Sequence, residues 1–152
     1  MGPADHQPRT SRQEPLIPAG TYEGTVFWND VSDWYADGDY NFRLVRDDEA
    51  GMTAENKIKV PTGKKSMKLE FDPDETIDHF DTPWWNAFHK AVDDGFSAAN
   101  AMIVGPDGNA GTFGIVTGLI GLDCPHTCAS ELHPVWAMAI RVKSDQALAN
   151  LP

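Results

Sequence analysis

The 152-residue chain carries 23 acidic and 12 basic residues, which gives a formal net charge of −11 at neutral pH. This excess of negative charge repels phosphate backbones and anionic lipid, so it disfavours a nucleic-acid partner. The hydrophobic fraction of 41% is enough for one core, and no apolar run approaches the roughly 18 residues that a membrane-spanning helix requires.

The two ends of the chain differ in composition from its centre. Residues 1–18 are polar and contain four prolines, which predicts a flexible leader. Residues 19–145 hold the periodic apolar segments of a single domain, and residues 146–152 form a short tail.

Three segments in the first half alternate apolar and polar residues, which is the period of a half-buried strand. They are Thr21–Trp28, Tyr40–Val45 and Met67–Phe71. The weaker alternation of residues 52–61 is compatible with an extension of the hairpin that the second segment forms. We therefore expect three strands before the period changes near Thr82.

A helix is predicted to follow the third strand. Thr82 is a suitable N-cap, Pro83 suits the first helical turn, and Gly95 provides a stop. Large apolar residues recur between these positions at three- and four-residue spacing. The segment 97–104 is compatible with a second short helix.

Two further strands are expected near the C-terminus. Phe113–Leu122 is apolar and β-branched but contains three glycines, which suits a strongly bent barrel strand. Pro134 lies within the last strand and implies an edge position or a bulge there. The even-numbered apolar residues of that strand are expected to share one face: Leu132, Trp136, Met138, Ile140 and Val142.

Together these elements predict a mainly β fold with a helical insertion (α+β). The order of three strands, a helix and two strands is typical of a five-stranded OB-like β-barrel. An open α+β sheet would produce similar local patterns, so this alternative stays open.

The segment that joins the last two strands carries the densest group of metal-ligating side chains. Two carboxylates and two imidazoles, which suit zinc, manganese or another divalent metal, come from Asp123, His126, Glu131 and His133. A hairpin would bring these residues within reach of one another. The simpler interpretation is that they make turn hydrogen bonds and face solvent, and a third is catalysis without a metal.

Cys124 and Cys128 are the only cysteines and lie four residues apart. A disulfide between them would rigidify the turn, and we favour it together with an oxidising compartment, secreted or periplasmic rather than cytoplasmic. The alternatives are a reduced pair in a cytosolic protein and a thiolate metal site with His126 as a third ligand.

The segment Asp123-x-x-His126, followed by Glu131–Val135 with the sequence Glu-Leu-His-Pro-Val, resembles the closing motif of small uncharacterised bacterial proteins with an OB-like barrel. Those proteins also carry a Gly-Asp-Tyr second strand, which Gly38–Tyr40 matches here, and Asn41 stands where similar sequences often have histidine. The resemblance covers the barrel strands. It implies the barrel fold but no particular reaction.

Aromatic residues outside the predicted strands suggest a different site. Trp34, Tyr35 and Trp84 fall in a loop or at a helix start, where Trp and Tyr side chains often contact ligands. Because no complete catalytic signature is present, the first interpretation is a non-catalytic binding module for a protein or a small ligand.

The sequence supports two alternative functions. One is a metal-dependent hydrolase, in which two imidazoles and one carboxylate of the group formed by Asp123, His126, Glu131 and His133 hold the ion. The remaining carboxylate would then act as general base. The other is OB-type nucleic-acid binding or a nuclease, by analogy with other such barrels.

Overall fold

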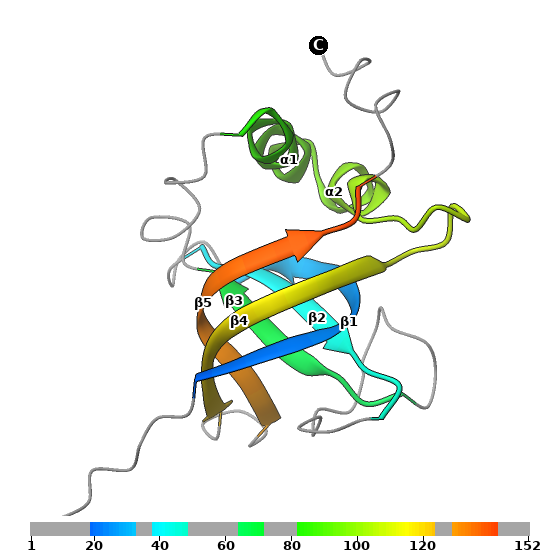
Figure 1. Cartoon of the computed structure of the whole chain (residues 1–152). Helices are drawn as coiled ribbons and strands as arrows, with labels where there is room; N and C mark the ends of the chain where they lie inside the picture. The colour runs from blue at the N-terminus through cyan, green and yellow to red at the C-terminus, as the bar shows by residue number, and fades with distance from the viewer. Residues whose placement is uncertain (1–18, 33–37, 49–63, 72–81, 124–128, 143–152) are drawn as a thin grey trace, which may run out of the picture.

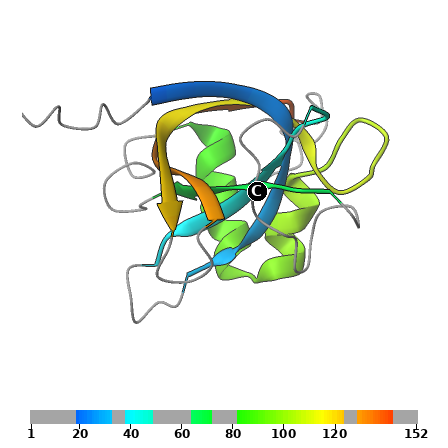
Figure 2. The same cartoon turned by 90° about the horizontal axis from the view of Figure 1, so that it is seen from below.

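In the computed structural model, five strands close into a barrel and two helices lie together at one end of it (Figure 1). Viewed along the barrel, the strands form a ring and the helices lie across its far end (Figure 2). The structure describes residues 19–32, 38–48, 64–71, 82–123 and 129–142. In chain order the elements are β1 (Ala19–Val31), β2 (Tyr40–Val45), β3 (Met67–Phe71), α1 (Pro83–Asp93), α2 (Phe96–Met102), β4 (Thr112–Asp123) and β5 (Ala129–Ile140).

The long strand β1 closes the barrel because it pairs with two neighbours. Its N-terminal part runs antiparallel to β4 and its C-terminal part runs antiparallel to β2. The order around the barrel is β1-β2-β3-β5-β4. Strands β3 and β5 run parallel, whereas the other described pairs are antiparallel. This pairing sets β5 beside a strand that is distant from it in the sequence.

The prediction of a mainly β barrel with a helical insertion is confirmed, and the insertion contains two helices. The bounds of β2 and β3 are those that alternation predicts, whereas β1 and β4 extend beyond the predicted segments. Residues 52–61, with their weaker strand pattern, lie outside the described residues. Among the described helices, neither has the length and apolarity to cross a membrane.

Aromatic rings from the strands and from α1 fill the interior. Phe88 on α1 is fully buried, and its ring lies 5.2 Å from Trp28, 5.6 Å from Phe42 and 5.3 Å from Trp84 between centroids. These edge-to-face and stacked arrangements are the ones that ring quadrupoles favour. The inward residues of β2 and β3 surround them: Tyr40, Phe42, Leu44, Met67, Leu69 and Phe71. Helix α1 thus closes the end of the barrel.

Thr82 caps α1 as predicted, because its hydroxyl accepts a hydrogen bond from the backbone N–H of Trp85. We expect Thr82→Ala to lower the free energy of unfolding by about 1 kcal/mol, since that N–H loses its partner. Urea denaturation measures the change. Ser97→Ala, at an exposed position in α2, is the control and should change stability less. Equal losses in the two variants would contradict a capping role for Thr82.

The predicted inward face of the last strand is wrong at Trp136. This side chain is 49% exposed, whereas Val135, expected on the opposite face, is fully buried. Relative to β4, β5 carries one extra residue between Leu132 and Val135 and another between Val135 and Ala137. Each extra residue reverses the alternation between inside and outside, so Trp136 is displaced outward.

Pro134 lies at the first of these bulges and not at an edge, because β5 is paired on both sides. On β4, Gly118 pairs with the next residue, Val135. A Cβ on Gly118 would lie 2.7 Å from the Pro134 carbonyl oxygen, so the backbones approach more closely than any other residue would allow. The bulge and the glycine therefore depend on each other.

Candidate metal centre

Three strands bring polar side chains to one patch on the outer wall of the barrel. Asn41 on β2, Glu70 on β3 and His133 on β5 point outward, because the residue before each of them belongs to the core. The register of β2 and β3 pairs Asn41 with Glu70. The parallel register of β3 and β5 carries His133 alongside Glu70. Asp39, immediately before β2, completes the patch.

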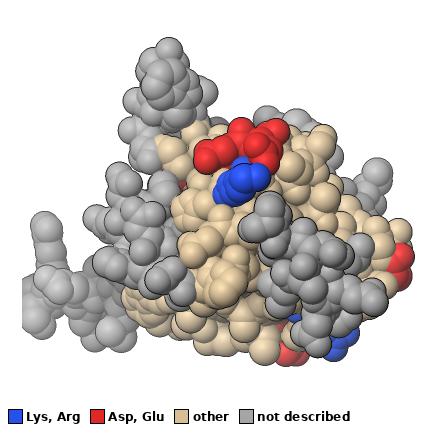
Figure 3. All heavy atoms as spheres, turned by 90° about the horizontal axis from the view of Figure 1, so that it is seen from above, with Lys and Arg blue, Asp and Glu red and all other residues tan. Residues whose placement is uncertain are grey.

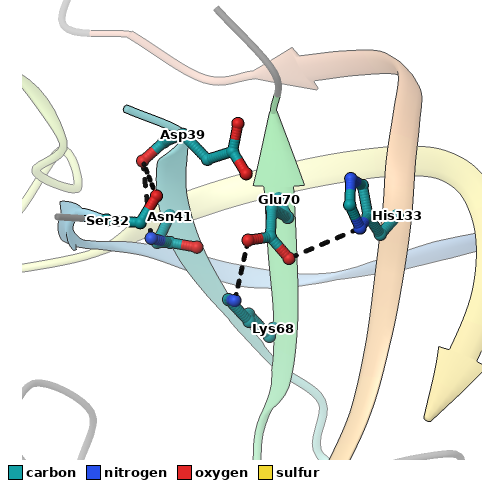
Figure 4. A network of polar contacts seen from close by, with 6 residues as sticks. All are labelled: Ser32, Asp39, Asn41, Lys68, Glu70 and His133. Carbon is teal, nitrogen blue, oxygen red and sulfur yellow. Dashed lines mark hydrogen bonds and ion pairs between the residues drawn. The ribbon is translucent and has the colours of Figure 1, made fainter. Parts of the chain in front are cut away.

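Asp39, Glu70 and His133 form what we call the Asp–Glu–His cluster. Each residue offers one ligand atom, and the three atoms lie within 4.8 Å of one another. His133 Nδ1 is 3.6 Å from Glu70 Oε2 (Figure 4). Both acidic residues are buried, whereas the His133 side chain is 44% exposed. The cluster is thus enclosed on its acidic side and open to solvent on its histidine side.

Neighbouring groups hold the two acidic residues in place. The backbone N–H of Ser32, at the end of β1, donates to the Asp39 carbonyl at 2.8 Å, and the Ser32 hydroxyl donates to the same oxygen at 3.3 Å. The Asn41 side-chain amide also donates to that carbonyl, with Nδ2 at 3.4 Å. Lys68 Nζ lies 2.9 Å from Glu70 Oε1 and forms an ion pair with it. These contacts fix the backbone of Asp39 and the carboxylate of Glu70.

The side-chain oxygen of Asn41 is the unusual feature of the patch. Asn41 is only 3% exposed, and its Oδ1 has no hydrogen-bond partner. Figure 4 shows this oxygen pointing toward the carboxylate of Glu70, its partner across the strands. With the amide nitrogen and oxygen exchanged, the nitrogen would face the Glu70 carboxylate and the oxygen would face the Asp39 carbonyl, so in either orientation the amide oxygen faces another acceptor. A buried acceptor without a donor is costly, and a cation would satisfy it.

The charges of the cluster also favour a cation. Two charged carboxylates within 4.8 Å of each other repel by at least about 3.5 kcal/mol at an effective dielectric constant of about 20. The Lys68 ammonium pairs with the Glu70 carboxylate. Carboxylate oxygens and an imidazole nitrogen are ligands that zinc and manganese accept.

The four residues expected to act together do not all join this cluster. His133 belongs to it. Asp123 ends β4 opposite Ala129, and His126 lies outside the described residues. The carboxylate of Glu131 lies over β4, since a Cβ on Gly121 would be 3.5 Å from Glu131 Oε1.

The other predicted site residues have different outcomes. Cys124, Cys128, Trp34 and Tyr35 lie outside the described residues, so the disulfide and the loop aromatics stay predictions. Trp84 is partly buried on α1 and stacks on the ring of Phe88, so it contributes to the packing of the helix on the barrel.

Sequence reasoning did not select Asp39 or Glu70 as ligands. Asp39 entered only as part of a family resemblance, and Glu70 only as a polar residue of an alternating strand. Glu70 lies on the outward period of β3, and Asp39 lies two residues before the outward-facing Asn41, so alternation is consistent with both positions. What was missing was the pairing of β3 with β5.

Two other charged regions of the described surface are weaker candidates for a functional site. A shallow pocket of about 300 Å³ beside β1 and β2 contains Arg46, whose guanidinium is paired with Asp48 at 2.6 Å. The helical end shows a small acidic group next to a basic one on a largely uncharged face (Figure 3). At the C-terminal end of α1, Lys90 and Asp94 form an exposed ion pair, which contributes little to the stability of the fold.

Comparison of the chain with protein-family models, with curated proteins and with solved structures gives no match. The function is therefore argued from the site itself.

Proposed function

We propose that this chain is a binding module for a divalent transition-metal ion, zinc or manganese, held by Asp39, Glu70 and His133. The observation that carries the proposal is the convergence of three ligand atoms within 4.8 Å, beside a buried Asn41 oxygen that has no donor. The side-chain amide of Asn41 is held by the Asp39 carbonyl, so its oxygen is directed at the place where the ion would lie.

The spacing of the ligand atoms supports a metal site. Two ligands that are each about 2.1 Å from an ion, at a tetrahedral angle, lie about 3.4 Å apart. His133 Nδ1 and Glu70 Oε2 are 3.6 Å apart, close to that value. The three ligand atoms lie within 4.8 Å of one another, so the Asp39 carboxylate oxygen would have to move closer to the other two to reach the spacing of about 3.4 Å. A rotation of the Asp39 side chain can provide this movement.

The barrel supports the proposal as a scaffold. A strand order of β1-β2-β3-β5-β4 with helices between β3 and β4 suits an OB-like barrel, which is the fold that the closing motif implies. Glu70 and His133 lie on strands, and ligands placed on strands are held more rigidly than ligands placed on loops.

A metal-dependent hydrolase is the second candidate. The exposed side of His133 leaves coordination positions to solvent, and a metal-bound water there would be activated as a nucleophile. An open coordination position is the feature that separates catalytic metal sites from structural ones.

Titration of chelator-treated protein with zinc and with manganese tests metal binding directly. We expect one equivalent of at least one of these ions to bind with a Kd of about 1 μM or lower. At a free metal concentration a hundred times the Kd, the bound ion should stabilise the fold by about 2.7 kcal/mol. Elemental analysis of protein purified without chelator gives an independent measure.

Less than about a tenth of an equivalent of metal in the purified protein, together with no thermal stabilisation by either ion, would contradict the proposal. Calcium provides the control, since it prefers more oxygen ligands and no imidazole, and it should bind more weakly.

A further inference from the structure

Lys68 gives the Asp–Glu–His cluster a property that the three ligands alone do not have. The formal charges of Asp39, Glu70 and Lys68 sum to −1. Those of Arg43 and Glu131, which the strand registers place on either side of Lys68, cancel each other. A divalent ion adds two positive charges to this sum. The loaded site therefore attracts anions more strongly than the empty site does.

Lys68 and His133 lie on opposite oxygens of the Glu70 carboxylate. Lys68 Nζ is 2.9 Å from Glu70 Oε1, and His133 Nδ1 is 3.6 Å from Glu70 Oε2 (Figure 4). An ion bound beside His133 would thus share Glu70 with Lys68. It would withdraw negative charge from the carboxylate and weaken the ion pair between Glu70 and Lys68.

Lys68 and His133 are both within reach of solvent. The Lys68 side chain is 21% exposed and the His133 side chain is 44% exposed, so a small ligand can approach between them. The two oxygens of a carboxylate lie about as far apart as two oxygens of a tetrahedral oxyanion. One phosphate group can therefore contact both the ammonium and the ion. A lysine acts as a point charge for phosphate, and a metal with open positions accepts a phosphate oxygen directly.

We propose that the metal-loaded site binds the phosphate group of a small molecule, which bridges the metal ion and the Lys68 ammonium. This inference rests on the proposed metal binding. The net charge of −11 opposes polyanions, so a mononucleotide or another phosphomonoester fits better than a nucleic acid.

The test is calorimetry on the full chain in two stages. Zinc or manganese is first titrated into chelator-treated wild type, Lys68→Gln and Lys65→Gln. Inorganic phosphate, phenyl phosphate and acetate are then titrated into each protein, with and without one equivalent of metal. Lys65→Gln is the matched control, because it removes the same charge from an exposed residue just before β3.

We expect phosphate and phenyl phosphate to bind loaded wild type at least tenfold more tightly than they bind the metal-free protein. Lys68→Gln, saturated with metal, should lose about tenfold in phosphate affinity. Lys65→Gln should resemble wild type in both stages. Tighter binding of phenyl phosphate than of inorganic phosphate would assign the site to phosphomonoesters, and the reverse order to free phosphate.

The two proposals fail in different ways. Absence of metal binding in the first stage overturns both of them. Metal binding without metal-dependent phosphate binding, or with acetate bound more tightly than phosphate, overturns the phosphate site and leaves the metal site standing. Equal phosphate affinity in Lys68→Gln and Lys65→Gln overturns the role of Lys68.

Discussion

Replacing Phe88 by alanine is expected to lower the free energy of unfolding by about 3–5 kcal/mol, which is most of the stability of a marginal domain. Phe88 is fully buried, and its ring contacts aromatic rings of the barrel and of α1. Its removal leaves a cavity where α1 closes the barrel. The rigid rings around this position limit how far the cavity can collapse.

Urea denaturation followed by tryptophan fluorescence measures this loss, because Trp28 and Trp85 both contact the Phe88 ring. Phe113→Ala is the matched control: Phe113 is 46% exposed on the outer face of β4, so the same truncation should cost about 1 kcal/mol or less. Similar losses in the two variants would mean that α1 does not pack on the barrel as described.

Replacing Glu70 by glutamine is expected to raise the Kd for zinc or manganese at least about a hundredfold, equivalent to about 2.8 kcal/mol. The amide keeps the shape of the side chain but removes the charge that an ion would neutralise, and it is a weaker ligand than a carboxylate. It also releases Lys68 from its ion pair, which adds an uncompensated positive charge beside the ion.

Glu131→Gln is the informative control for this substitution. Glu131 belongs to the ligand group suggested by the sequence, but its carboxylate lies over Gly121 on β4. We expect Glu131→Gln to change the Kd by less than about threefold. If Glu131→Gln abolished metal binding and Glu70→Gln did not, the ion would belong to the hairpin of Asp123, His126 and His133 instead.

The strands and the start of the helix could be predicted from the sequence because their determinants are local. Alternation with a period of two gives the bounds of Tyr40–Val45 and Met67–Phe71 correctly, since each residue's orientation follows from that of its neighbour. The cap at Thr82 is equally local, because its hydroxyl reaches a backbone N–H three residues away. Such signals require no knowledge of the rest of the fold.

The inward face of the last strand could not be predicted from local alternation. Alternation assigned Trp136 to the core, but two extra residues in β5 relative to β4 place Val135 there instead. A bulge depends on what the partner strand permits, and here it depends on Gly118. The sequence of β5 alone contains only Pro134 as a sign of irregularity.

The candidate site was decided by the tertiary structure. The sequence determined which residues of β2 and β3 face outward, and it singled out His133. Its partners, Asp39 and Glu70, lie more than sixty residues earlier in the chain, and only the parallel pairing of β3 with β5 brings them together. The register of such a pairing is set by closure of the whole barrel around its core, so no local pattern can specify it.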